Sequence, residues 1–146
     1  MQEQFKLFTG LIASINRNIR KVKTEIMAGH NLKSPHVSPL YYLYTEEELT
    51  LKQLCQRCNE DKGVISRSVK SLEQEGLVDT NFINKKYKNK LCLTESGKVV
   101  GKEIFEKINC AIIDATQGLT DEDKDCIYRS LSSINKNLQN FKITKE

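Results

Sequence analysis

Seven apolar residues recur through the first part of the chain at spacings that alternate between three and four. They are Phe5, Phe8, Ile12, Ile15, Ile19, Val22 and Ile26. On an α-helix this spacing puts every member on one narrow stripe, which is the pattern of a seam between packed helices. A stripe of this length needs an apolar surface of equal length. The first helix, which we expect to end near Gly29, should therefore pack along a long partner.

A second stripe of this kind lies near the other end of the chain. Its members, spaced four, three, four and three residues apart, are Ile127, Leu131, Ile134, Leu138 and Phe141. Thr120, followed by three acidic residues, is a typical helix start, because carboxylates favour the positive end of the helix dipole. The pattern predicts a last helix over about 121–141.

Length and composition exclude several classes of protein. The chain has 146 residues, of which 38% are apolar and 29% charged, and we expect one domain over residues 1–146. No apolar run approaches the roughly 20 residues of a transmembrane helix, and the first residues do not form a secretory signal. We therefore expect a cytoplasmic protein without a membrane partner. Its five cysteines should then stay reduced.

Between the two stripes the sequence predicts shorter helices. One of them begins at one of two Ser-Pro pairs, and Ser34 and Ser38 are equally suited to cap it. Its apolar face carries Leu40, Leu43 and Tyr44. The two starting points differ by one turn of helix, and the sequence does not decide between them.

A pair of helices separated by a three-residue turn comes next. Thr50 and Gln53 form a capping box that opens a helix over 51–58, and the following helix runs over 62–75 until Gly76 ends it. The inward residues of the pair are Leu51, Leu54, Cys55 and Cys58 in the first helix and Ile65, Val69 and Leu72 in the second.

After this pair the hydrophobic period changes to about two. Residues 77–83 and 89–94 predict two strands of a hairpin with a basic tip at 84–88, and Thr94 caps a helix over about 95–116. The fold class that follows is mainly α with a small β-hairpin wing (α+β), a winged helix-turn-helix with long flanking helices.

Positive charge is concentrated in the helix over 62–75 and in the hairpin. Seven basic residues stand against three acidic ones between Lys62 and Lys90, so this segment carries the whole chain's excess of +4. A helix-turn-helix inserts its second helix into the major groove, where basic and small polar side chains meet phosphates and bases. We therefore predict double-stranded DNA as the partner. The predicted DNA-binding residues are Lys62, Gly63, Ser66, Arg67, Lys70, Lys85, Lys86, Lys88 and Lys90.

The order of these elements resembles that of the MarR family of bacterial transcriptional regulators. The resemblance covers about residues 5–141 and is most specific in EELTLKQLCQRCNEDKGVISRSVKSLEQEGLVDT and KLCLTESGK. It implies a homodimeric repressor on a pseudo-palindromic operator, with a DNA-binding lobe over 30–93 and dimerisation helices in 1–29 and 94–146. The implied dimerisation residues are Phe5, Phe8, Ile12, Ile15, Ile19, Ile127, Leu131, Ile134 and Leu138.

The wing departs from the family's pattern. Wings of the family often carry an Asp-Arg-Arg sequence, whereas this chain has Lys85-Lys86-Tyr87. Lysine is a point charge without the planar fork of arginine. We therefore expect this wing to bind phosphates with less selectivity for base or groove shape.

The family's effectors are often small aromatic or phenolic molecules that bind between the dimerisation helices and the DNA-binding lobe. The resemblance implies such a cleft bordered by His30, His36, Tyr41, Tyr44 and Cys110. Each of these residues is equally consistent with a plain core or surface position. An effector bound there would alter the spacing of the two lobes and hence the affinity for the operator.

Other combinations of residues suggest metal or thiol chemistry. Cys55 and Cys58 form a CxxC pair, but their inward spacing on a helix favours core packing, since zinc needs two further ligands. Glu25 and the two histidines fit surface or capping roles better than a metal site. Cys110 and Cys126 leave open a thiol-based, redox-gated regulator.

The sequence carries no pattern of catalytic residues. It has no Ser-His-Asp order, no Gly-rich phosphate loop and no HExxH motif. We therefore expect no enzymatic activity, no cofactor and no metal. The alternative from a different functional class is a winged-helix module that docks an acidic protein partner.

Overall fold

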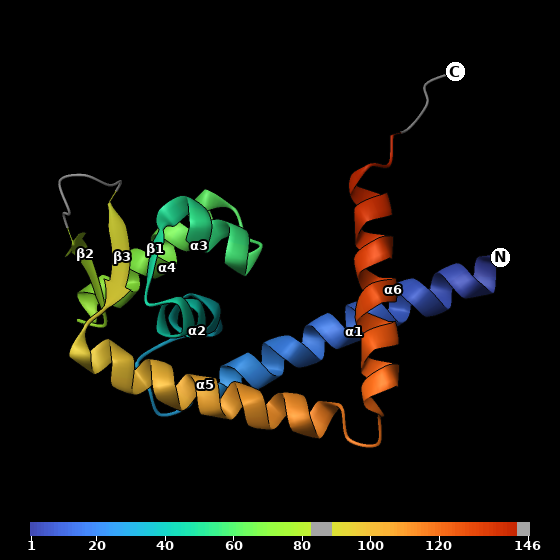
Figure 1. Cartoon of the computed structure of the whole chain (residues 1–146), viewed down its shortest axis with the longest axis horizontal. Helices are drawn as coiled ribbons and strands as arrows, with labels where there is room; N and C mark the ends of the chain where they lie inside the picture. Colours follow the sequence, from blue (N-terminus) through green and yellow to red (C-terminus); the bar gives the residue numbers. More distant parts are fainter. Residues whose placement is uncertain (83–88, 143–146) are drawn as a thin grey trace. The chain divides into compact units, whose positions relative to one another are not determined.

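Short helices and a small sheet enclose one apolar core in the middle of the chain. The computed structural model describes residues 1–82 and 89–142. The elements are α1 (Gln2–Ile26), the 3-10 helix η1 (Ser34–His36), α2 (Val37–Glu46), β1 (Glu48–Thr50), α3 (Leu51–Cys58), α4 (Lys62–Gln74), β2 (Val78–Phe82), β3 (Lys90–Leu93), α5 (Glu95–Ala115) and α6 (Asp121–Gln139) (Figure 1). The chain divides into two compact units, residues 1–110 and residues 111–146.

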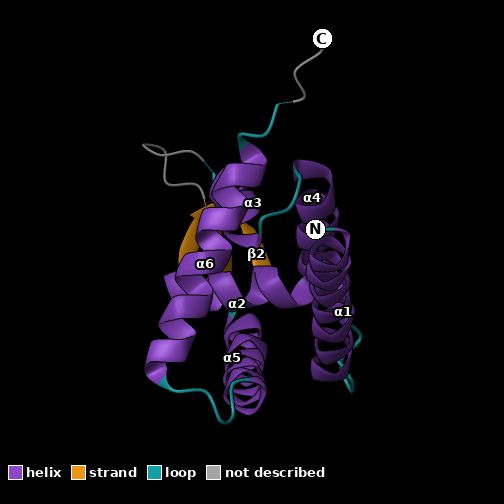
Figure 2. Cartoon of the chain, turned by 90° about the vertical axis from the view of Figure 1, so that its right-hand side faces the viewer, coloured by secondary structure: helices purple, strands orange, loops and turns teal. Residues whose placement is uncertain are grey.

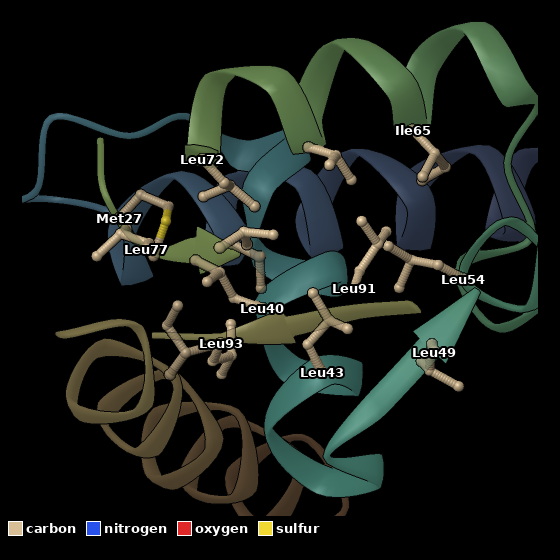
Figure 3. Close-up of a cluster of buried hydrophobic side chains, with 14 of the residues drawn as sticks. Met27, Leu40, Leu43, Leu49, Leu54, Ile65, Leu72, Leu77, Leu91 and Leu93 are labelled. Atoms are coloured by element: carbon tan, nitrogen blue, oxygen red, sulfur yellow. The ribbon is translucent and has the colours of Figure 1, made fainter. Parts of the chain in front are cut away.

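The core draws aliphatic side chains from every helix and strand between α1 and α5 except η1. Leu40, Leu54 and Leu72 are completely buried, and Ile65 is nearly so (Figure 3). Ile104 of α5 is completely buried as well. Burying a side chain of this size contributes about 1.5–3 kcal/mol. The predicted inward faces of α3 and α4 are confirmed in their central residues, because the helical period alone determines which positions share a face.

The sheet has three antiparallel strands in the order β1-β3-β2. Leu49 of β1 pairs with Leu91 of β3, and Val78 of β2 pairs with Leu93 of the same strand. The mainly helical fold class with a small antiparallel sheet is confirmed (Figure 2). The third strand, β1, was not predicted, because three residues are too few to show a period of two.

Side-chain caps begin four of the described helices, α3, α4, α5 and α6, and Thr94 caps α5 by accepting the N–H of Gly97 at 3.0 Å. The Thr50 hydroxyl accepts the N–H of Gln53, and the Thr120 hydroxyl accepts the N–H of Asp123, so both of these predicted caps are confirmed. The Asp61 carboxylate accepts the N–H of Val64 at 2.9 Å and caps α4. Sequence reasoning assigned Asp61 only to the turn. Since a cap involves residues only three positions apart, the Asp61 cap could have been predicted from the sequence.

The start of the second helix differs from both predicted alternatives. Neither Ser34 nor Ser38 caps it, because η1 runs directly into α2. The backbone N–H of Lys33 donates instead to Nδ1 of His36 at 2.8 Å. Pro39 then lies in the first turn of α2, where its missing N–H costs no helical hydrogen bond.

The His36 ring is buried and accepts a hydrogen bond, so it is held neutral. Burial lowers the pKa of His36 below 6.5, and the nearby Lys33 charge lowers it further. Below that pH the unfolded chain takes up a proton that the folded chain excludes, so stability should fall as pH falls from about 7 to about 5.5. We expect the His36→Gln variant to show a flatter dependence when urea unfolding is compared at the two pH values. An equal slope in both proteins would contradict this assignment.

The apolar stripes of the two long helices are largely exposed. Of α1, only Ile26 is buried, and Phe5 and Ile15 are 70% and 51% exposed. On α6, which ends two residues earlier than predicted, no residue is buried. Each stripe, taken within its own unit, therefore presents exposed apolar side chains over the described residues.

None of the described helices combines the length and the apolar character that crossing a bilayer requires.

Candidate nucleic-acid interface

The two helices of the helix-turn-helix are held in place from the inside. Leu54 of α3 and Ile65 of α4 are both buried in the shared core. Between the helices, Asn59 adopts a left-handed conformation with φ of 52°, and Asp61 caps α4. The turn thus stops one helix and starts the next within three residues, and the outer face of α4 is left uncovered.

That outer face carries the predicted DNA-binding residues of the helix. Lys62, Gly63, Arg67 and Lys70 are exposed, and Ser66 is half-buried. A Cβ atom built on Gly63 would lie 3.6 Å from Nη1 of Arg67. The guanidinium therefore lies over the first turn of α4, so the basic groups gather toward the N-terminal half of the helix.

The acidic residues of α4 lie at the opposite end and have partners there. Glu73 accepts the Thr80 hydroxyl of β2, and Glu75 accepts the Asn31 side-chain amide at 3.0 Å. The predicted separation of basic and acidic ends along α4 is therefore present in the structure. Both carboxylates also tie the C-terminal end of the helix to neighbouring segments.

The wing is described only in part. Lys85, Lys86 and Lys88 lie outside the described residues. Lys90 begins β3 and forms an ion pair with Glu48 of β1, across the strand pair. Its ammonium group is therefore shared with a carboxylate, which distinguishes Lys90 from the basic residues of α4.

A further arginine of the helix-turn-helix, Arg57, forms an ion pair between two helices. Nε of Arg57 in α3 lies 2.7 Å and 3.1 Å from the two carboxylate oxygens of Glu46, at the end of α2. The hydrogen bonding of Nε to this carboxylate raises the pKa of Arg57. The pair joins the end of α3 to α2. The sequence did not predict it, because the two residues lie on different helices.

His30, one of the five predicted cleft residues, is paired with a carboxylate of α5. Nε2 of His30 lies 3.2 Å from Glu103 of α5, and Lys107 lies close to the same carboxylate. Hydrogen bonds from Lys107 and His30 lower the pKa of Glu103. His36 is buried, and Cys110 is exposed on α5.

Tyr41 and Tyr44 meet at a residue that sequence reasoning missed. The Tyr41 ring stacks on Phe105 of α5 with centroids 5.8 Å apart, and the Tyr44 ring contacts the same phenyl at 5.6 Å. Tyr44 and Phe105 line a groove among α2, β3 and α5. Of the five predicted cleft residues, Tyr44 lines this groove. No periodic pattern singles out Phe105, because its role depends on a helix 60 residues away.

The cysteines are free thiols with different surroundings. Cys55 and Cys58 are half-buried, and burial raises the pKa of Cys58 to about 12. A thiol of this pKa is almost entirely protonated at neutral pH and is a poor nucleophile. Over residues 1–82 and 89–142, no cluster of three or more His, Cys, Asp or Glu side chains is suited to hold a metal ion.

The sequence of the helix-turn-helix is similar to a known protein family. A family model described as MarR family matches residues 30–81, which span the helix-turn-helix and the first wing strand. The helix-turn-helix segment of this chain is thus similar to that of the MarR family. No curated protein is a significant match to the sequence of this chain.

Solved structures share the fold at low sequence identity. The Staphylococcus aureus MepR–DNA complex has a TM-score of 0.80 at 15% identity and covers 90% of this chain and 96% of that chain. Streptococcus pneumoniae FabT in complex with DNA has a TM-score of 0.74 at 14% identity, with coverages of 94% and 99%. A MarR family regulator from Silicibacter pomeroyi has a TM-score of 0.77 at 23% identity, with coverages of 97% and 96%. At such identities the likeness shows a shared fold.

Proposed function

We propose that this chain is a member of the MarR family and a sequence-specific DNA-binding transcriptional regulator that represses its target genes. The observation that carries the proposal is the exposed, basic N-terminal half of α4 on a helix-turn-helix whose other face is fixed in the core. Two proteins of the same fold, MepR and FabT, have been solved with DNA. Such a protein acts where the DNA is, in the cytoplasm, and needs no catalytic group or cofactor.

The outer residues of α4 fall into two groups, those placed to contact bases and those placed to contact phosphates. Ser66, Arg67 and Lys70 are the candidates for base contacts, since they follow one another along the outer face of the helix. Lys62, at the first position of α4, is suited to a phosphate, as the helix N-terminus itself favours an anion. The three wing lysines at 85, 86 and 88 would neutralise further phosphates.

The exposed stripes of α1 and α6 support homodimerisation. Their exposed residues include Phe5, Ile15, Ile19, Ile127 and Leu138. A second copy offers an apolar surface of matching length and character. A two-fold dimer presents two α4 helices to successive major grooves, so the operator would be pseudo-palindromic.

A small aromatic effector would act through the groove at Phe105. The groove has a volume of about 900 Å³, within the range of small-molecule sites. Its aromatic wall of Tyr44 and Phe105 spans α2 of the DNA-binding lobe and α5. A flat apolar ligand lodged there would shift α2 against α5 and thereby change the spacing of the two recognition helices.

The first test is binding of the purified protein to its own upstream intergenic DNA, with competitor DNA at near-physiological salt. Sequence-selective binding with two-fold symmetric protection supports the regulator. Weak binding that is sensitive to salt and indifferent to sequence contradicts it for this DNA, and favours a protein partner for the basic face.

Arg67 provides a sharper test of base reading. A guanidinium that reads a base contributes about 1–3 kcal/mol of discrimination, so Arg67→Ala should weaken operator binding about tenfold to a hundredfold and random DNA much less. Lys62→Ala is the matched control, because losing a phosphate contact should weaken both DNAs alike. Equal losses on operator and random DNA for Arg67→Ala would remove Arg67 from the base-reading residues. Competition titrations of both variants measure the difference.

A further inference from the structure

A second concentration of positive charge lies outside the helix-turn-helix and the wing. Between residues 17 and 33 the chain has five basic residues and one acidic residue, Glu25. The basic residues are Arg17, Arg20, Lys21, Lys23 and Lys33. Four of them belong to α1, and of these four, all but the half-buried Lys23 are exposed. The DNA-binding residues predicted above do not include this segment.

The structure brings part of this charge to the start of α4. Arg20 and Lys23 of α1 line one groove together with Glu60 and Val64, at the N-terminal turn of α4. The groove continues over Ser38 at the start of α2. Its long wall is thus basic and belongs to α1, while its opposite wall is the end of α4 that approaches DNA.

The two basic groups of the groove differ in how they are held. Nζ of Lys23 donates to the Ser38 hydroxyl at 2.9 Å, which fixes the ammonium group at the groove without neutralising it. In the described part of the chain Arg20 has no ion pair with a carboxylate. Glu60 is the one acidic residue that lines the groove. The groove therefore keeps a net positive charge in the folded chain.

We propose that Arg20 and Lys23 bind phosphates of the same DNA whose major groove receives α4. The inference rests on the proposed function and extends its interface. A helix that enters the major groove has a row of phosphates on either side of it, since the groove is only about 12 Å wide. The element beside the N-terminal turn of α4 is the basic wall of α1. The wall is positively charged and exposed, so its charge is complementary to that of an extended polyanion such as DNA.

The salt dependence of operator binding tests the inference. Each phosphate contact contributes about 0.9 to the slope of log affinity against log salt. A homodimer loses two contacts with one substitution, so Arg20→Gln should lower the slope by about 2, and Lys23→Gln likewise. Between 50 and 200 mM salt, the affinity of either variant should then fall about tenfold less than that of the wild type. Arg17→Gln is the matched control, because it removes the same charge from α1 at a position that does not line the groove.

The outcomes separate this inference from the proposed function. Wild-type operator binding with an unchanged slope in Arg20→Gln overturns the inference and leaves the regulator standing. An equal slope change in Arg17→Gln shows an effect of net charge and also overturns it. A loss of dimer by Arg20→Gln in sedimentation shows that a second copy covers the groove. Failure of the wild type to select any DNA sequence overturns both proposals.

Ethylation interference provides the positive signature. With the wild type, ethylation of particular phosphates in each half-site should block binding. Some of those phosphates should become indifferent to ethylation in Arg20→Gln and stay sensitive in Arg17→Gln. An identical interference pattern for all three proteins contradicts the contact.

Discussion

The Gly97→Ala variant is expected to melt about 10 °C below the wild-type protein. A Cβ atom at this position would lie 1.9 Å from the carbonyl oxygen of Leu77 and 2.9 Å from its carbonyl carbon. Both are backbone atoms, so the overlap is relieved only if α5 moves off the joint between α4 and β2. We expect a loss of about 3 kcal/mol, at the upper end of overpacking substitutions, which for a chain of this size corresponds to roughly that change in Tm.

The Leu77 carbonyl has little freedom to retreat. It accepts the backbone N–H of Thr94 at 3.0 Å, and the Thr94 hydroxyl donates to the carbonyl of Gly76 at 2.6 Å. Displacing the carbonyl would therefore break the contacts that hold the first turn of α5 to the lobe. The N-terminal end of α5 is fastened to the C-terminal end of α4 through this joint.

Gly10→Ala is the matched control for this prediction. Gly10 lies in the interior of α1, and a Cβ there would meet no atom within 4 Å. Alanine at an exposed helix interior is favoured over glycine by up to about 1 kcal/mol, so this variant should melt at or above the wild-type temperature. Thermal unfolding followed by circular dichroism measures both variants. A Gly97→Ala protein that melts within a few degrees of the wild type would show that the joint is adaptable.

Gly97 also shows where sequence reasoning stops. The sequence predicts a helix from about residue 95, and α5 begins there, because the Thr94 cap is a local signal. Nothing within that helix indicates that position 97 must lack a side chain. The requirement comes from Leu77, twenty residues earlier, and exists only once the strand and the helix have packed.

The candidate interface divides in the same way. The capped helices, the turn and the outward position of Arg67 follow from spacings of three to seven residues, and the structure has them. The ion pair of Lys90 with Glu48 and the hydrogen bond of Asn31 to Glu75 join residues more than 40 positions apart. Tyr41 on Phe105 is a contact of the same type. Such pairs depend on the fold, and of the residues expected to border a cleft, Tyr44 lines the groove beside Phe105.

The second large effect is expected at the apolar stripe of α1. Ile15 is 51% exposed in the single chain and lies in the middle of the stripe. In the proposed homodimer it would be covered by a second copy, and an aspartate there would be buried without a partner. Since burying an unpaired charge costs several kcal/mol, Ile15→Asp should raise the Kd of the dimer at least about a hundredfold. Sedimentation over a range of concentrations measures the change.

Leu7→Asp separates the stripe from exposed apolar surface in general. Leu7 is 64% exposed on the same helix but does not belong to the three-and-four pattern. The aspartate would then stay in solvent, and the dimer should persist. If both variants remain dimeric, the stripe of α1 is not the interface, and the homodimer must use another surface.

Operator binding should follow the dimer. Two recognition helices joined in one particle bind two half-sites with an effective local concentration that separate lobes do not have, which increases affinity about 10²–10⁴-fold. Ile15→Asp should therefore lose operator affinity although Ile15 belongs to α1 and not to the helix-turn-helix. Its lobe should still bind a single half-site as weakly as the wild-type lobe does. Loss of half-site binding as well would mean that the substitution had damaged the DNA-binding lobe itself. The damage would then be expected where α1 packs on the lobe, at the buried Ile26 and near His36.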